Sequence, residues 1–168
     1  FYMQINFKVD ISKYKNIGKN KDTLVVYFSR MGYTKRVAYD KANELKVDIL
    51  RLETDELTEN TKGFWWCGRF GMHKWRMSIK DIDIDIKKYK NVIIVSPIWV
   101  FSVASPIRDF CYKYSRDINN VQYIFVHFMN SIFKNVADEV DKILNKKRDG
   151  FTSVCMRFGN IKKYEVLK

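Results

Sequence analysis

The sequence has only two prolines, and no uninterrupted apolar run in it approaches the ~18–20 residues that a membrane-spanning helix needs. Its first residues also lack a signal-peptide pattern. Hydrophobic residues make up 46% of the 168-residue chain, which excludes an intrinsically disordered protein and suffices for a buried core. We therefore expect a single globular domain in the cytoplasm.

Cysteine and histidine are scarce, and this limits the chemistry that the chain can support. The three cysteines, Cys67, Cys111 and Cys155, are widely spaced and form no C-x-x-C pair. Cys111 and Cys155 lie within apolar patterns, so we expect buried, reduced thiols there. His73 and His127 have no second histidine and no cysteine–carboxylate set at metal-ligand spacing. The sequence therefore predicts no metal site, and no Ser/His/Asp or Cys/His spacing argues for a catalytic nucleophile.

Acidic residues are few relative to basic ones. The chain has 19 Asp and Glu against 31 Lys and Arg, which gives a formal net charge of +12 and an isoelectric point near 9.6. Such a charge favours acidic partners, whether nucleic acid, anionic lipid, an acidic protein or a phosphorylated ligand. A composition rich in Lys, Asn and Ile is also typical of proteins from AT-rich genomes, so the charge by itself selects no partner.

Apolar runs rich in β-branched and aromatic residues predict buried strands. Segments with helical spacing of apolar residues lie between them, and they begin near Thr34, at Ser105-Pro106 and at Ser131, where serine suits the N-cap and proline the first turn. Alternating strands and helices indicate a doubly wound parallel α/β sheet covered on both faces. The first expected strand begins at Thr23, and the others are Val47–Leu52, Asn91–Ser96, Val121–Val126 and Phe151–Phe158.

Residues 3–11 alternate between apolar and polar side chains, which predicts an extra, half-buried strand ahead of the sheet. Residues 1–22 are then an N-terminal strand and a lysine-rich connector, and residues 23–168 form the main domain. The edge of the extra strand offers a pairing surface for a second copy of the chain. At the other end, residues 159–168 show weak helical patterning after the last expected strand.

Three loops follow the carboxyl ends of the expected strands, where a doubly wound sheet binds its ligands. The first, Ser29–Thr34, leads into a helix whose N–H groups and dipole attract an anion, although a plain strand-to-helix turn is the alternative. The second is Ser96–Ser102 and the third His127–Ser131. Trp99 in the second loop offers a stacking face, with an ordinary core position as the alternative. Together the loops suit an aromatic ring that carries a phosphate.

Two motifs in this order resemble those of the flavodoxin family over about residues 23–158. They are Val25-Val26-Tyr27-Phe28-Ser29-x-x-Gly32-x-Thr34 and Ile94-Val95-x-Pro97-Ile98-Trp99, followed by Pro106 ahead of an amphipathic helix. The resemblance implies a five-stranded parallel sheet of order 2-1-3-4-5 that binds FMN, with the phosphate in the first loop and the isoalloxazine ring against the other two. The implied FMN-binding residues are Ser29, Arg30, Met31, Gly32, Tyr33, Thr34, Pro97, Ile98, Trp99, Val100, His127, Phe128, Met129 and Asn130.

Two functional hypotheses follow. The first is an FMN-binding redox protein that transfers electrons to an unidentified redox partner or catalyses flavin-dependent reduction. The second is a flavin-free module of the same fold whose basic face binds nucleic acid, an anionic membrane or an acidic protein. The third loop has no glycine, so Phe128 or Met129 either blocks the ring site or stacks on the ring.

The segment Lys62–Lys80 mixes basic residues with five aromatic ones and contains no acid. Such a mixture suits single-stranded nucleic acid or an anionic membrane surface. Three tryptophans so close together nevertheless favour burial, either against the sheet or over a flavin.

Overall fold

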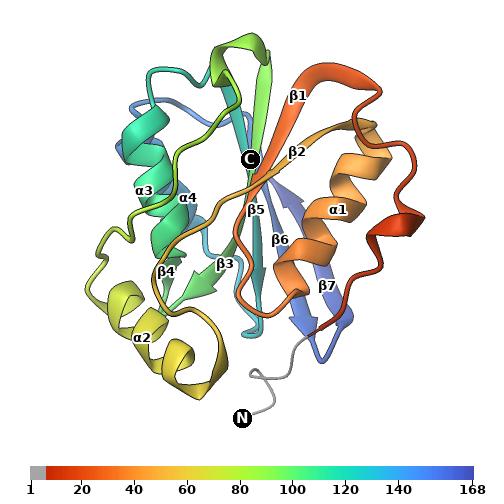
Figure 1. Cartoon of the computed structure of the whole chain (residues 1–168). Coiled ribbons are helices and arrows are strands. Elements are labelled where there is room, and N and C mark those ends of the chain that lie inside the picture. Colours follow the sequence, from red (N-terminus) through yellow and green to blue (C-terminus); the bar gives the residue numbers. More distant parts are fainter. Residues whose placement is uncertain (1–6) are drawn as a thin grey trace.

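The computed structural model describes residues 7–168, which fold into a twisted sheet between two layers of helices (Figure 1). Helix α1 packs on one face of the sheet, and α3 and α4 pack on the other. None of the helices in the described part of the chain is long and apolar enough to cross a bilayer. The elements are β1 (Asn20–Tyr27), α1 (Tyr33–Leu45), β2 (Val47–Arg51), α2 (Asn60–Met72), β3 (Asn91–Trp99), β4 (Ser102–Val103), α3 (Ser105–Tyr114), β5 (Asn120–His127), α4 (Lys134–Leu144), β6 (Gly150–Arg157) and β7 (Asn160–Leu167).

The sheet has the order β2-β1-β3-β5-β6-β7, and the short β4 pairs with the end of β3. Strands β2 to β6 along this path pair in parallel, whereas β7 is antiparallel to β6. The expected α/β class with a mostly parallel sheet is therefore confirmed. Because β1 lies between β2 and β3, the direction of winding reverses between β1 and β3, and a ligand crevice is expected at their carboxyl ends.

The extra strand predicted over residues 3–11 does not form in its described part. Residues 7–10 have no regular structure, and Ile11–Lys13 form a 3-10 helix. Asp10 caps this helix by accepting hydrogen bonds from the Ser12 backbone N–H and hydroxyl, and Ile11 is 53% exposed instead of half-buried. Local capping has thus overridden the alternating pattern. The remainder of the predicted strand lies outside the described residues.

The extra strand of this fold is at the C-terminal end of the sheet instead. Residues 160–167, for which the sequence showed weak helical patterning, form β7. The turn between β6 and β7 consists of Phe158 and Gly159, whose φ angles of 53° and 83° are both positive. Two consecutive positive φ values are typical of the tight turns that match the twist of a β-hairpin. The last segment therefore folds back along β6 as an edge strand.

Two helices do not begin at the serines that were expected to cap them. The N-cap of α3 is Ala104, and Ser105 is the first helical residue, with a buried hydroxyl that has no hydrogen-bond partner among the described residues. Helix α4 begins at Lys134, after Phe133 in a left-handed conformation, so Ser131 lies outside the helix. Burial of the Phe133 side chain, which is 4% exposed, fixes the entry into α4 in place of a serine cap.

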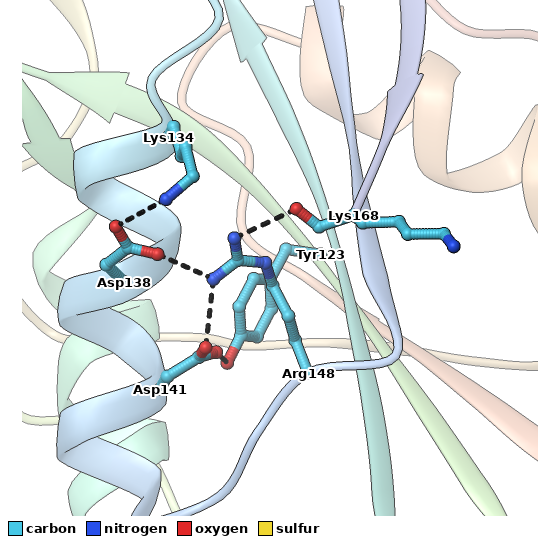
Figure 2. A network of polar contacts seen from close by, with 6 residues as sticks. All are labelled: Tyr123, Lys134, Asp138, Asp141, Arg148 and Lys168. Atoms are coloured by element: carbon cyan, nitrogen blue, oxygen red, sulfur yellow. Dashed lines mark hydrogen bonds and ion pairs between the residues drawn. The ribbon is translucent and has the colours of Figure 1, made fainter.

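The C-terminal part of the sheet is tied to α4 by a polar network around Arg148 (Figure 2). One Arg148 nitrogen donates to Asp138 and Asp141, both at 2.9 Å, and the other donates to the Lys168 carbonyl at 3.0 Å. The Tyr123 hydroxyl, on β5, donates to Asp141 at 2.7 Å. Since the Arg148 side chain is 8% exposed, this network joins β5, β7 and α4 in a partly dry environment.

We expect Arg148→Ala to lower the melting temperature, because it leaves Asp141 and Tyr123 without their cationic neighbour. Hydrogen bonds from Arg148 and Lys134 hold the pKa of Asp138 below its ordinary value. The stabilisation by ionised Asp138 is present above the unfolded-state pKa of this carboxyl and is lost as the pH falls through its folded-state pKa. The difference in melting temperature between wild type and variant therefore narrows in acid. Thermal melts at neutral and acidic pH test this, and a constant difference would contradict it.

Candidate functional site

A cavity of about 360 Å³ opens at the carboxyl ends of β1, β3, β5 and β6. The three loops singled out in the sequence come together around it. All the sequence-predicted site residues line this cavity except Gly32 and Asn130. The lining residues are Ser29, Arg30, Met31, Tyr33, Thr34, Phe64, Cys67, Gly68, Pro97, Ile98, Trp99, Val100, Phe101, Val126, His127, Phe128, Met129, Phe133, Met156 and Phe158.

The first loop presents an uncapped helix N-terminus to the cavity. Gly32 is the N-cap of α1, has a φ of 104° and supplies no side-chain cap. The Ser29 hydroxyl oxygen accepts a hydrogen bond of 3.0 Å from the Gly32 N–H, which closes the loop into a tight turn. Ser29 and Thr34, 4% and 3% exposed, both line the cavity. The arrangement therefore directs hydroxyl groups and the positive end of the α1 dipole toward an anion.

Gly32 is fixed both by its positive φ and by a close backbone contact. A Cβ at this position would clash with the carbonyl oxygen of Phe7. The Phe7 N–H also donates to the Met31 carbonyl at 2.7 Å, and the Phe7 ring stacks on Tyr33 at 5.1 Å. The segment at Phe7 thus packs against the first loop, and Phe7 is not among the residues that line the cavity.

Arg30 binds protein carbonyl groups. Its guanidinium donates to the backbone oxygens of Thr58 and Asn60, both at 3.2 Å, and lies 5.4 Å from the centre of the Phe64 ring. Burial lowers the Arg30 pKa. The Arg30 side chain therefore links the first loop to the start of α2, and Arg30 also lines the cavity.

The second loop places apolar side chains at the cavity mouth through a strained turn. Trp99 is 9% exposed and packs edge-on against Phe28 at 5.6 Å, so it belongs to the core and forms part of the cavity wall. Val100 and Phe101 have φ angles of 46° and 61°, which β-branched and bulky residues rarely adopt. They are 48% and 58% exposed. The mouth is thus framed by exposed apolar groups held in a costly backbone conformation.

The third loop leaves the cavity open although it has no glycine. His127, 6% exposed, bonds the Met129 carbonyl through Nδ1 and the Ser153 hydroxyl through Nε2, both at 2.7 Å. A carbonyl can only accept, so Nδ1 carries the proton. In the neutral ring Nε2 then accepts the single Ser153 proton in preference to the Ser131 carbonyl, which lies farther from the hydroxyl at 3.2 Å. Burial lowers the His127 pKa, which agrees with a neutral ring. Phe128 and Met129, 40% and 51% exposed, lie on the cavity wall.

Segments outside the three loops also line the cavity. Helix α2 supplies Phe64, Cys67 and Gly68, and the end of β6 with its turn supplies Met156 and Phe158. Met156 and Phe158 could have been predicted from the sequence, because β6 ends at the same edge of the sheet as the other parallel strands. Burial raises the pKa of the Cys67 thiol to about 12, so this cysteine lines the cavity in its neutral form. All three cysteines are free and buried, as expected for Cys111 and Cys155.

The tryptophans of residues 62–80 are not buried as expected. Trp65 is 70% exposed, Trp75 42% and Trp66 37%. For Trp65 and Trp66 the physical reason lies in α2, which meets the rest of the protein through its small residues, Gly63, Cys67 and Gly71.

The fold resembles those of several solved structures. No protein-family model and no curated protein sequence matches the chain. Among solved structures, a flavoprotein from Lactobacillus acidophilus NCFM in complex with FMN superposes with a TM-score of 0.64 and 20% identity, over 81% of this chain and 93% of its own. A candidate flavoprotein from Bacteroides eggerthii DSM 20697 gives a TM-score of 0.65 and 23% identity, over 84% and 90% of the two chains.

A third similar structure, from Bacteroides uniformis ATCC 8492, has a TM-score of 0.65 and 19% identity, over 83% of this chain and 94% of its own. Such likenesses establish a common fold. With the order of its parallel strands and the crevice between β1 and β3, the chain has the flavodoxin-like fold.

Proposed function

We propose that the cavity binds FMN and that the protein is a flavodoxin-like redox protein, which transfers electrons or carries out flavin-dependent reduction. The observation that carries the proposal is the combination, in one cavity at the switch point, of an uncapped helix N-terminus and apolar, aromatic walls. A phosphate and a planar ring are the two parts of FMN that need these two environments. The fold shared with an FMN-bound flavoprotein supports the assignment.

The first loop fits a phosphate by the chemistry of its donors. The Ser29 hydroxyl oxygen accepts from the Gly32 N–H, so its own proton can be donated to a ligand oxygen. Thr34 adds a second hydroxyl on the same wall, and the first turn of α1 adds backbone N–H groups. Hydrogen bonds to a charged oxygen are the strong ones, so this loop would supply much of the affinity.

The remaining walls fit a planar aromatic ring. A volume of about 360 Å³ lies within the ordinary range of small-molecule pockets, ~300–1,000 Å³. Phe101 and Phe128, both exposed at the mouth, offer ring faces from the second and third loops. His127 fixes the third loop by holding the Met129 carbonyl, so Phe128 stands on a rigid support.

Bound FMN would supply the redox chemistry, and the protein's part is to bind, orient and shield it. The residues described along the cavity wall include no carboxylate, so no negative charge is placed beside the ligand there. The apolar rim would exclude water from the ring.

The proposal is tested by titrating FMN into the purified protein and following flavin fluorescence. We expect quenching with one site per chain, and weaker binding of riboflavin because it lacks the phosphate. A protein that quenches neither ligand at high excess would refute the proposal. Binding of riboflavin as tight as that of FMN would refute the phosphate site.

Thr34→Ala is expected to weaken FMN binding about ten- to a hundredfold, because one hydroxyl bond to a charged oxygen contributes ~1.5–3 kcal/mol. The same substitution should leave the affinity for riboflavin nearly unchanged. Thr34→Ser keeps the hydroxyl and serves as the matched control. Equal FMN affinity in the Ala variant and the wild type would show that the phosphate does not contact Thr34.

A further inference from the structure

Helix α2 is built in the reverse of the usual pattern for a surface helix. Such helices normally bury their large apolar residues and expose polar ones. In α2 the buried positions are Gly63, Cys67 and Gly71, one every four residues. The large apolar residues Trp65 and Met72 are 70% and 60% exposed.

The small residues are fixed by close contact with the protein. A Cβ on Gly63 would lie 2.4 Å from the Thr58 carbonyl carbon, and a Cβ on Gly71 would lie 2.7 Å from the Trp99 carbonyl oxygen. These neighbours are backbone atoms, so they cannot move aside as a flexible side chain can. Helix α2 therefore approaches the protein too closely for tryptophan on its inner side, but nothing in this packing requires tryptophan on its outer side.

The outer face of α2 consists of large apolar and basic side chains. Lys62, Trp65, Trp66, Arg69 and Met72 are all exposed and follow one another at spacings of three, one, three and three residues, which places them on one side of a helix. The helix contains no acidic residue. Trp66 donates through its ring nitrogen to Glu56 at 2.8 Å, outside the helix. We call these five residues the outer face of α2.

We propose that the outer face of α2 docks this protein on the surface of an anionic lipid bilayer. Indole rings are favoured at the level of the lipid headgroups, and interleaved Lys and Arg attract anionic lipids. Met72, 60% exposed, adds apolar surface that acyl chains accommodate.

A single-stranded nucleic acid is the less suitable partner. Such ligands need a groove that follows the backbone, with aromatic faces on which bases stack. The outer face of α2 is the convex side of a helix, and it carries the flexible side chain of Met72 beside its tryptophans. The docking surface is separate from FMN binding, because neither Trp65 nor Met72 lines the cavity. Phe64 and Cys67 on the same helix do line it, so docking would bring the cavity close to the bilayer.

The test is sedimentation of the full chain with vesicles of phosphatidylcholine alone and of phosphatidylcholine and phosphatidylglycerol in equal parts. We expect binding to the anionic vesicles, with a blue shift of tryptophan fluorescence, and much weaker binding to the neutral ones. The double variant Trp65→Gln/Met72→Gln should reduce the affinity about tenfold or more. Lys62→Gln/Arg69→Gln should remove most of the preference for anionic vesicles and the salt sensitivity of binding.

Matched controls lie on other parts of the surface. Val166→Gln on β7 replaces an apolar side chain that is 75% exposed, and Lys88→Gln/Lys90→Gln removes two exposed cations near the amino end of β3. These variants should bind vesicles as the wild type does. Unchanged melting temperature and FMN affinity in the α2 variants would show that the fold is intact.

Several results would overturn the docking proposal. One is the absence of binding to both kinds of vesicle, and another is equal binding by the wild type and the Trp65→Gln/Met72→Gln variant. Tight binding of an oligothymidine that the α2 variants lose, without vesicle binding, would assign the outer face to nucleic acid. A concentration-dependent dimer that the α2 variants lose, again without vesicle binding, would assign it to a second copy.

Discussion

Gly68→Trp is expected to reduce FMN affinity about a hundredfold or more, and to do so without unfolding the protein. Gly68 lies in α2 and lines the cavity, and a Cβ built on it meets no atom of residues 7–168 within 4 Å. A side chain at this position therefore has open space before it. An indole ring would occupy much of a cavity of about 360 Å³, which the isoalloxazine ring needs.

Gly68→Ala is the matched control. Replacing glycine by alanine inside a helix stabilises it by ~0.5–1 kcal/mol, and one methyl group leaves most of the cavity open. The Ala variant should therefore melt slightly higher than the wild type and still bind FMN. Fluorescence titration and thermal melts of both variants decide the outcome. A Trp variant that folds and binds FMN as tightly as the wild type would place the ligand outside this cavity.

The sequence contained enough information for the parallel sheet and for the three loops at its edge. The run Val92–Val95 is apolar throughout because both faces of a parallel sheet are covered, and its short length and β-branched residues distinguish it from a buried helix. Loops that follow such strands must meet at one edge. For this reason residues as distant in sequence as Ser29, Pro97 and His127 could be assigned to one site.

The turns could not be predicted, because their residues contradict local preference. Val100-Phe101 and Phe158-Gly159 are turns with positive φ, yet three of these four residues carry large side chains. Asn or Gly at these positions would have indicated a hairpin, whereas Phe158 read as the end of a strand. The strand β7 was missed although Gly159 precedes it, because the residues that follow showed weak helical patterning.

The orientation of α2 was missed for a different reason. Hydrophobicity suggested that its tryptophans face the core, but the distance between a helix and its neighbours is set by the smallest side chains at the contact. Gly63, Cys67 and Gly71 recur every four residues and form one stripe. That stripe was visible in the sequence, and it outweighs the aromatic residues because the approach of backbone to backbone leaves no room for them.

The position of α2 also depends on a buried carboxylate in α3. Asp109, 3% exposed, accepts hydrogen bonds from the Arg76 Nε at 2.9 Å and from the Ile79 N–H at 3.0 Å, and lies 2.9 Å from the Lys113 Nζ. Residues 76–79 lie three residues beyond the end of α2, so this carboxylate holds the segment that continues from the C-terminal side of α2. Ile79 is 6% exposed, and its N–H has no access to bulk water if Asp109 is removed.

We therefore expect Asp109→Ala to lower the free energy of unfolding by about 3 kcal/mol, because a buried N–H loses its acceptor and two cations lose their partner. Asp109→Asn keeps an acceptor for the Ile79 N–H and should cost less. Asp117→Ala is the control, since its ion pair with Lys87 at 3.7 Å is exposed and such pairs contribute ~0–1 kcal/mol. Urea unfolding followed by circular dichroism measures all three. If Asp109→Ala cost no more than Asp117→Ala, the segment after α2 would be held by its apolar contacts, chiefly Met77 and Ile79, and not by the carboxylate.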